Sequence, residues 1–290
     1  MFFIIIFLIF FLPQMLYGYY FTLPASSYSS GEIILKDNDS AIFFNNSFNG
    51  FNNKNKIIFT GVYFDNAIFT EGESLNKFSG IISYSSLKYF NIDLAYNFFN
   101  YTYYNESYIL AGISKNIKNN FSISLTFKYF STQFLNFDIN DPILNNGETK
   151  SSEYNFDYSV CYRIKKEILS GISFENLLSV NDFFTKSSVN DMPFIIRVNI
   201  MTPFYLKRIK GDIGTQVEFK KNNMRYHIGF SIPVFKYFKY SAGYISNSSI
   251  NTGFSLLYNF NNINTEIDYA LKYLYNIETI SHIISLKIKF

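Results

Sequence analysis

The sequence has one cysteine, Cys161, and two histidines, His227 and His282. A single thiol excludes an internal disulfide and any cysteine-rich metal site. Few bases are present for hydrolytic chemistry, which needs a nucleophile and a base within hydrogen-bond reach. No Gly-x-Ser-x-Gly elbow, Walker loop, dinucleotide fingerprint or metal-ligand spacing occurs. We therefore expect no enzymatic activity, no cofactor and no bound metal.

Charge is also scarce, since Asp, Glu, Lys and Arg make up 16% of the chain, against about 25% in soluble globular proteins. The net charge of +3 is diffuse. Its densest basic spots are Lys54 with Lys56 and Lys207 with Arg208, and neither forms a stripe that would bind nucleic acid. We expect no nucleic-acid partner.

Long apolar runs are absent beyond the N-terminus. Residues 1–12 are all apolar, which is the length of a signal-peptide core and too short for a spanning helix of about 20 residues. We expect a signal peptide at 1–18, cleaved after Gly18. The alternative is an uncleaved anchor, because no basic residue precedes the run. No later run reaches the length of a transmembrane helix.

Aromatic residues are abundant instead. Phe (35) and Tyr (25) together outnumber Lys and Arg (25) and Asp and Glu (22) combined, and they are spread along the whole chain. An apolar outer wall with aromatic girdles at two membrane interfaces has this composition.

Apolar and small polar residues alternate with a period of two. Between 121 and 129, for example, the odd positions are apolar and the even ones are Ser122, Ser124, Thr126 and Lys128. Such alternation is typical of strands with two different faces. It predicts an all-β fold, a transmembrane antiparallel barrel of about fourteen strands, near 57–66, 78–85, 88–97, 108–114, 120–130, 153–163, 167–177, 193–204, 211–220, 223–233, 237–246, 250–260, 264–271 and 281–289.

The connections support a barrel, because short ones alternate with longer ones at 67–77, 98–107, 131–152, 178–192 and 272–280. Two connections, near Lys221 and near Ser248, stay short and break this alternation. Bacterial barrels have short periplasmic turns and longer outer loops. This pattern predicts a protein of the bacterial outer membrane with both termini in the periplasm. The last strand ends on Phe290 and resembles the terminal signal that the barrel-assembly machinery recognises; the alternative is that it is simply a last strand. Outer-membrane lipid and that machinery are therefore expected partners.

The segment 26–53 precedes the first strand and lacks strand alternation. It contains the aromatic pair Phe43 and Phe44, which loose polar linkers rarely keep. We expect residues 19–56 to form a plug or hatch in the lumen, ahead of a barrel at 57–290. A disordered periplasmic tail is the alternative that its Asn-rich composition permits.

Strand parity places a sparse set of ionisable residues on the polar face, which is the lumen in a barrel of this size. They are candidates for lining a passage or a ligand site. Structural salt bridges that fill the interior are the alternative. The set is Asp93, Asp157, Glu175, Arg197, Glu218, His227, Asp268 and Lys287.

Several short patterns resemble one family. They are the run 171–177 with Gly171 and Asn176, the run 226–230, the ending Ala242, Gly243 and Tyr244, and the N-terminal segment from Ser30 to Asn46. Together they resemble the PorV/PorQ-type barrels of type IX secretion, which are related to FadL-like fatty-acid transporters. The chain departs from the family pattern at Asn46, where Pro is usual, and at Ser47, where Ala is usual.

The resemblance implies a fourteen-stranded barrel with N-terminal residues in or under the lumen. It also implies a surface-secretion component that binds exported proteins. The alternative function is a passive outer-membrane channel for small or hydrophobic solutes. Transport predicts a lumen path or a lateral gap beneath a displaceable segment, whereas partner binding predicts a plugged lumen and long ordered outer loops.

Overall fold

The structure is a computed structural model of the 290-residue chain. The predicted signal peptide at 1–18 lies outside the residues that it describes. Those residues are Ser30, 32–35, 41–51, 56–66, 76–85, 90–101, 104–118, 120–134, 150–165, 167–182, 192–207, 209–221, 223–260, 263–275 and 279–290.

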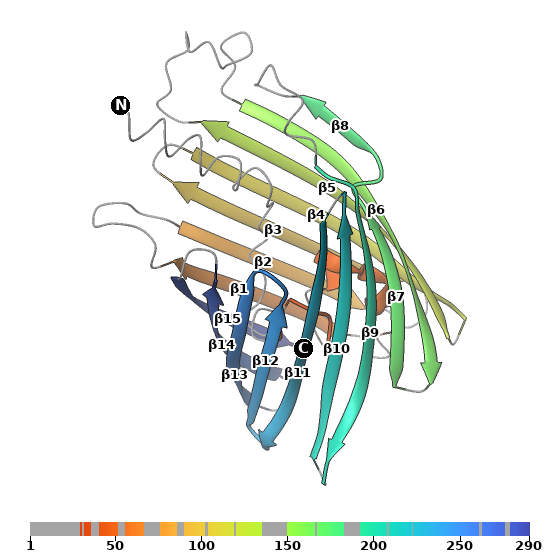
Figure 1. Ribbon diagram of the computed structural model, residues 1–290, viewed down its shortest axis with the longest axis vertical. Coiled ribbons are helices and arrows are strands. Elements are labelled where there is room, and N and C mark those ends of the chain that lie inside the picture. The colour runs from red at the N-terminus through yellow and green to blue at the C-terminus, as the bar shows by residue number, and fades with distance from the viewer. Residues whose placement is uncertain are drawn as a thin grey trace.

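Fifteen strands of the described chain form one antiparallel sheet (Figure 1). They are β1 (Lys56–Asn66), β2 (Asn76–Ser85), β3 (Asn91–Tyr101), β4 (Tyr104–Lys118), β5 (Phe121–Phe134), β6 (Lys150–Lys165), β7 (Ile168–Glu175), β8 (Ser179–Asp182), β9 (Ile195–Leu206), β10 (Ile209–Lys220), β11 (Asn223–Phe235), β12 (Phe238–Ile245), β13 (Ser249–Phe260), β14 (Ile263–Leu274) and β15 (Thr279–Lys289).

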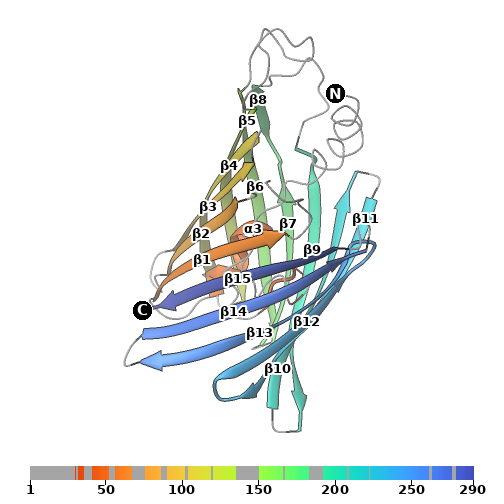
Figure 2. The same cartoon turned by 90° about the vertical axis from the view of Figure 1, so that its left-hand side faces the viewer.

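The backbone ladder runs around the sheet and returns to its start. Consecutive strands pair, β7 pairs with β9, and β1 pairs with β15. The pairing of β5 with β6 joins the two ends of this order. All strands except β8 thereby have at least two neighbours, so the sheet is a β-barrel of the kind that the sequence predicts. We call the end at which β15 finishes the short-turn end and the opposite end the loop end (Figure 2).

No helix in the described residues has the length and apolarity needed to cross a bilayer. The wall instead has two chemically different faces. Phe254 and Leu286 are 38% and 45% exposed, whereas their neighbours Ser255 and Lys287 are 2% and 1% exposed. The prediction that Lys287 lies on the polar face is therefore confirmed, and β13 shows the same alternation.

The outer face is joined across strands by aromatic pairs. Phe127 on β5 lies opposite Phe156 on β6, with ring centroids 5.3 Å apart. Phe254 on β13 lies opposite Tyr269 on β14 at 5.4 Å. Such cross-strand pairs contribute to sheet stability at a level of a few tenths to about 1 kcal/mol each.

The predicted loop at 98–107 is wrong, because β3 and β4 stay paired as far as Tyr101 and Tyr104. The loop at 131–152 is likewise shorter, since β5 ends at Phe134 and β6 begins at Lys150. Polar residues occupy both faces near the rim, so side-chain alternation fades there although the backbone ladder continues.

The N-terminal segment packs inside the barrel (Figure 2). It forms a short helix, α3 (Ala41–Phe44), and a 3-10 turn, η1 (Asn46–Phe51), in which every residue is buried. Phe43 is completely buried and Phe44 nearly so. The core of the molecule lies between this segment and inward-facing apolar residues of the wall, such as Ile81, Leu110 and Ile283.

Candidate functional site in the barrel lumen

The first part of the plug lies against β10 and β11. The carbonyl oxygen of Ser30 occupies the space where a Cβ at Gly229 would stand, and Ile33 and Leu35 lie within 3.2 Å of the Cβ position of Gly214. Glycine at these two positions allows the plug backbone to approach the wall closely. Residues 33–35 are buried by this contact.

Glu32 ties the same part of the plug to β14. Its carboxylate forms an ion pair with the Lys272 ammonium, and both side chains are largely buried. Burial raises the pKa of Glu32, but the charge and hydrogen bond of Lys272 together with the nearby His227 outweigh burial and lower that pKa below the usual value for Glu. Glu32 has a φ of 57°, a left-handed backbone conformation that is uncommon outside glycine.

The second part of the plug lies on the opposite wall, where α3 contacts β3 and β4 and η1 contacts β4 to β7. The Ser47 N–H donates to Ser159 Oγ at 3.3 Å, and the Asn91 amide donates to the Asn49 carbonyl. Since the first part lies on β10, β11 and β14, the described plug residues contact both sides of the lumen.

Two arginines of the wall face aromatic rings of the plug. The Arg197 guanidinium lies 5.0 Å from the ring centroid of Phe44, and that of Arg163 lies 4.3 Å from the ring of Phe51. These are cation–π distances. The plug is held by these contacts, hydrogen bonds and one ion pair, with no covalent bond between the described plug residues and the wall.

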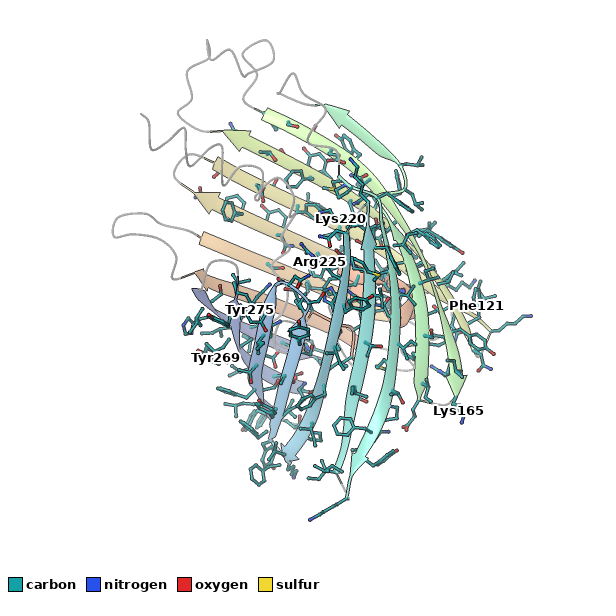
Figure 3. All side chains as sticks on the ribbon, viewed as in Figure 1. Phe121, Lys165, Lys220, Arg225, Tyr269 and Tyr275 are labelled. Carbon is teal, nitrogen blue, oxygen red and sulfur yellow. The ribbon has the colours of Figure 1, made fainter. Side chains whose placement is uncertain are left out.

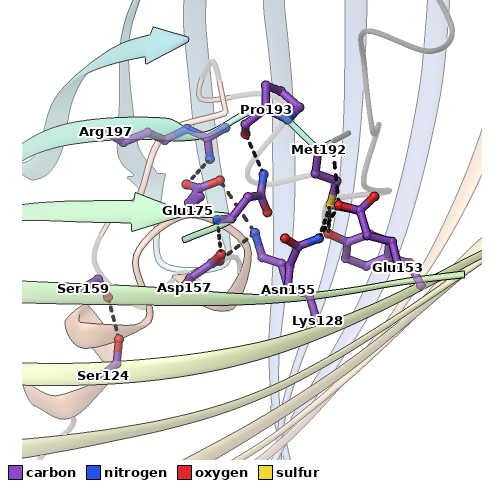
Figure 4. A network of polar contacts seen from close by, with 12 residues as sticks. Ser124, Lys128, Glu153, Asn155, Asp157, Ser159, Glu175, Met192, Pro193 and Arg197 are labelled. Atoms are coloured by element: carbon purple, nitrogen blue, oxygen red, sulfur yellow. Dashed lines mark hydrogen bonds and ion pairs between the residues drawn. The ribbon is translucent and has the colours of Figure 1, made fainter. Parts of the chain in front are cut away.

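A belt of charged residues crosses six neighbouring strands beside the plug, and Figure 4 shows four of these residues, Lys128, Asp157, Glu175 and Arg197. Lys128 Nζ lies 2.6 Å from Asp157 Oδ2 and 3.8 Å from Glu175 Oε2. Arg197 then bridges two carboxylates, at 2.8 Å from Glu175 and 3.0 Å from Glu218. His227 Nε2 ends the belt at 3.9 Å from Glu218 Oε2. We call these six residues the ion belt.

A second group of charges lies toward the short-turn end and is centred on Glu266. Its carboxylate pairs with Lys239 at 2.5 Å, Lys287 at 3.5 Å and Lys289 at 3.8 Å. Asp268, on the same face of β14, accepts a hydrogen bond from Ser285 Oγ at 3.1 Å. We call this set the Glu266 cluster.

The predicted lumen candidates are all buried, with exposed fractions of 7% or less. Five of them, Asp157, Glu175, Arg197, Glu218 and His227, meet in the ion belt. Asp268 and Lys287 lie in the Glu266 cluster. Asp93 is buried on β3 opposite Gly112, outside both groups. The arrangement of charges in opposite-sign groups fits the salt-bridged interior that the sequence left open as an alternative.

Sequence reasoning missed Lys128 of the ion belt and Lys239, Glu266 and Lys289 of the Glu266 cluster, and it also missed the ion pair of Glu32 with Lys272. Lys128 shares the parity of Ser124 and Thr126, and Glu266 shares that of Asp268. Parity alone could have found both. Lys272 was missed because the predicted strand stopped at 271, one residue before it.

The wall has a break in its ladder next to the ion belt. Strand β7 ends at Glu175, and β8 continues along β6 without pairing to β9 in the described chain. Asn176 lies at the break with φ 57°. Its N–H donates to Asp157 Oδ1 at 2.9 Å, and its side-chain amide donates to the Pro193 carbonyl at 2.8 Å. The ion belt therefore also holds the edge of the break.

Apolar residues gather on the inner side of this break. The Tyr108 and Phe130 rings lie 5.5 Å apart on neighbouring strands, and the Tyr108 hydroxyl is 3.8 Å from Met192 Sδ. All three residues are buried. On the outer side, Leu178 and Phe194 are 67% and 46% exposed. The break thus separates apolar side chains of the interior from apolar side chains of the outer surface.

No protein-family model matches the sequence, and no curated protein matches it. Solved structures do share its fold. The CymD monoaromatic hydrocarbon channel aligns with a TM-score of 0.60 at 10% identity, over 92% of this chain and 96% of that one. The toluene transporter TbuX of Ralstonia pickettii gives 0.60 at 9%, over 94% and 98%. A FadL homologue of Pseudomonas aeruginosa gives 0.58 at 9%, over 93% and 98%.

At such low identity, this likeness shows the fold alone. Fold and interior together define a plugged antiparallel β-barrel, with the architecture of FadL-type channels. The expected likeness to FadL-like barrels is confirmed at the level of fold. The more specific resemblance to PorV/PorQ-type barrels stays a prediction.

Proposed function

We propose that the chain is a passive outer-membrane channel for small hydrophobic molecules, which pass its N-terminal plug. The observation that carries this proposal is the plug itself. It fills the lumen from β3 to β14 through contacts that can be exchanged without breaking a covalent bond. A segment held in this way closes a passage and can yield to a ligand that competes for the same apolar contacts.

The chemistry of the interior favours uncharged solutes. Opposite charges pair within the ion belt and within the Glu266 cluster, whereas ion-selective pores carry rings of charges of a single sign. Ile42 and Phe43 of the plug and Tyr108 and Phe130 of the wall are buried residues of one apolar core. A solute that displaces the plug would meet this apolar surface.

The break beside β8 offers a lateral way out of the barrel. An apolar solute that leaves through it enters the membrane between Leu178 and Phe194 without crossing water, which is favourable for apolar surface. CymD is a monoaromatic hydrocarbon channel and TbuX is a toluene transporter, and their shared fold supports a transport role. They favour it over the secretion role that the sequence resemblance placed first, and over an enzymatic role.

Uptake measurements test the proposal. Gram-negative cells that express the chain should take up labelled toluene several-fold faster than cells with an empty vector, and a labelled sugar at an unchanged rate. Met192→Trp fills the inner side of the break and should slow toluene uptake. Met224→Trp, on an outward-facing residue of β11 that is 42% exposed, is the matched control. Equal toluene uptake with and without the protein in the outer membrane would refute the proposal.

A further inference from the structure

The two ends of the barrel differ in charge. The connections at the short-turn end, 86–90, 115–120, 163–168, 206–210 and 235–239, are rich in Lys and Arg and contain one acidic residue, Glu167. The connections 67–75 and 135–149, which join strands at the loop end, contain Asp and Glu but no Lys or Arg. The strand order therefore places a basic end opposite two long connections that carry only acidic charges.

Five lysines of the short-turn end are exposed, and none of them pairs with a carboxylate of the described residues. Glu167 is already paired with Lys210. Four consecutive hairpins around the wall carry these lysines, so they form an arc rather than a scatter. We call the arc the basic rim; it consists of Lys115, Lys118, Lys165, Lys207 and Lys236. Lys165 lies at the tip of the β6–β7 hairpin, far from Lys220 and Arg225 (Figure 3).

Aromatic and aliphatic side chains alternate with these lysines. Tyr205 and Phe235 are 65% and 72% exposed, next to Lys207 and Lys236, and Ile164 is 53% exposed beside Lys165. Exposed aromatics at a barrel end mark the level of the lipid headgroups. Lysines at that level lay their stems along apolar surface and hold their ammonium groups among the headgroups.

We propose that the basic rim binds the anionic headgroups of phospholipids in the leaflet next to the short-turn end. This inference rests on the proposed membrane placement of the barrel. Bacterial barrels turn their short connections to the periplasm, where the neighbouring leaflet consists of phospholipid. Each lysine close to an anionic lipid surface strengthens association about fivefold. The rim therefore selects anionic lipids as neighbours and fixes the depth and direction of the barrel.

Lipid selectivity measures this directly. The full chain is reconstituted in phosphatidylcholine vesicles, and spin-labelled phosphatidylglycerol is compared with spin-labelled phosphatidylcholine in the layer around the protein. We expect a preference for phosphatidylglycerol of about fivefold or more, which 1 M salt weakens because it shortens screening to about 3 Å. Changing all five rim lysines to Gln should bring the ratio close to one, and changing them to Arg should retain it. Lys150→Gln with Lys221→Gln, exposed at the loop end, is the control.

Three results would overturn the inference: no preference in the wild type, an equal loss in the loop-end control, or a stronger preference for labelled lipid A than for phosphatidylglycerol. If the barrel inserts but shows no preference between the two lipids, lipid binding by the basic rim is refuted and the proposed channel function is not. A chain that fails to insert into any of the vesicles refutes both.

Discussion

Arg197 is the residue on which the charges of the lumen converge. It holds Glu175 and Glu218 with its guanidinium group and presents the same group to the ring of Phe44. One planar fork can make both carboxylate contacts at once, which a lysine ammonium cannot do with the same geometry. The residue therefore joins β7, β9, β10 and the plug.

Replacing Arg197 with Met should destabilise the barrel by about 3–5 kcal/mol, because it removes the nearest cation from two buried carboxylates. Urea unfolding from lipid vesicles measures this change. Lys221→Met, on an exposed turn residue, should shift the free energy of unfolding by less than about 0.5 kcal/mol. If both variants unfold at the same urea concentration, the ion belt does not hold the wall.

Glu32 makes plug closure depend on pH. Because the folded chain lowers its pKa, the ion pair with Lys272 is complete above the unfolded value of about 4.3 and is lost as the pH falls through the lower folded value. His227 and Glu218 also act on this carboxyl, in opposite directions.

Wild-type channels should therefore stay closed at pH 4.5 and open more often at lower pH. Glu32→Gln should raise the open probability at neutral pH and flatten its acid response in single-channel recordings. Glu167→Gln, which removes an ion pair with Lys210 at the barrel end, should behave like the wild type. An unchanged acid response in Glu32→Gln would show that this ion pair does not hold the plug.

At the scale of elements, each strand presents one face to the outside and a different face to the lumen, while backbone hydrogen bonds continue from strand to strand. Phe254 faces outward in the middle of β13, and Ser255 faces the lumen near Asp268. The difference between these neighbours is the sharpest test of the register, since a slip by one residue would exchange the two faces.

Phe254→Arg should cost about 2–4 kcal/mol, the cost of a basic side chain on the lipid face at mid-depth. Ser255→Arg should cost clearly less, because its guanidinium can reach the carboxylate of Asp268. The free energy of unfolding of each variant, measured in lipid vesicles, tests this difference. A smaller cost for Phe254→Arg than for Ser255→Arg would place β13 in the other register.

The elements differ in how far sequence could predict them. All fourteen strands of the ring follow from period-two alternation, because lipid and lumen impose opposite demands on neighbouring side chains. The break after Glu175 did not follow, since it depends on the left-handed Asn176 and its bonds to Asp157 and Pro193. The run 167–177 looks like one uninterrupted strand in sequence.

The residues of the lumen show the same limit of prediction from sequence. Parity predicted which residues point inward, and the pair Phe43 and Phe44 predicted a buried plug. Partners such as Lys128 with Asp157, or Glu32 with Lys272, are brought together by the register of the closed ring. No local pattern encodes contacts between residues 240 positions apart. The expected domain limits at 18 and 56 remain predictions.

At the scale of the whole molecule, the barrel and the plug depend on each other. Glycines, two arginines and Lys272 of the wall contact one internal segment, and that segment supplies about half of the buried apolar core. A barrel with a polar inner face gains a buried core only when such a segment enters it. The plug is therefore both a structural filling and the closure of the proposed passage.

Deleting residues 26–53 tests the central claim most directly. Single-channel conductance of the deleted chain in planar bilayers should rise well above that of the full chain, while heat-modifiable gel mobility shows that the barrel still forms. A platform for exported proteins predicts no such rise. If the deleted chain forms an intact barrel and conducts no more than the full chain, the segment does not close a passage and the channel account is contradicted.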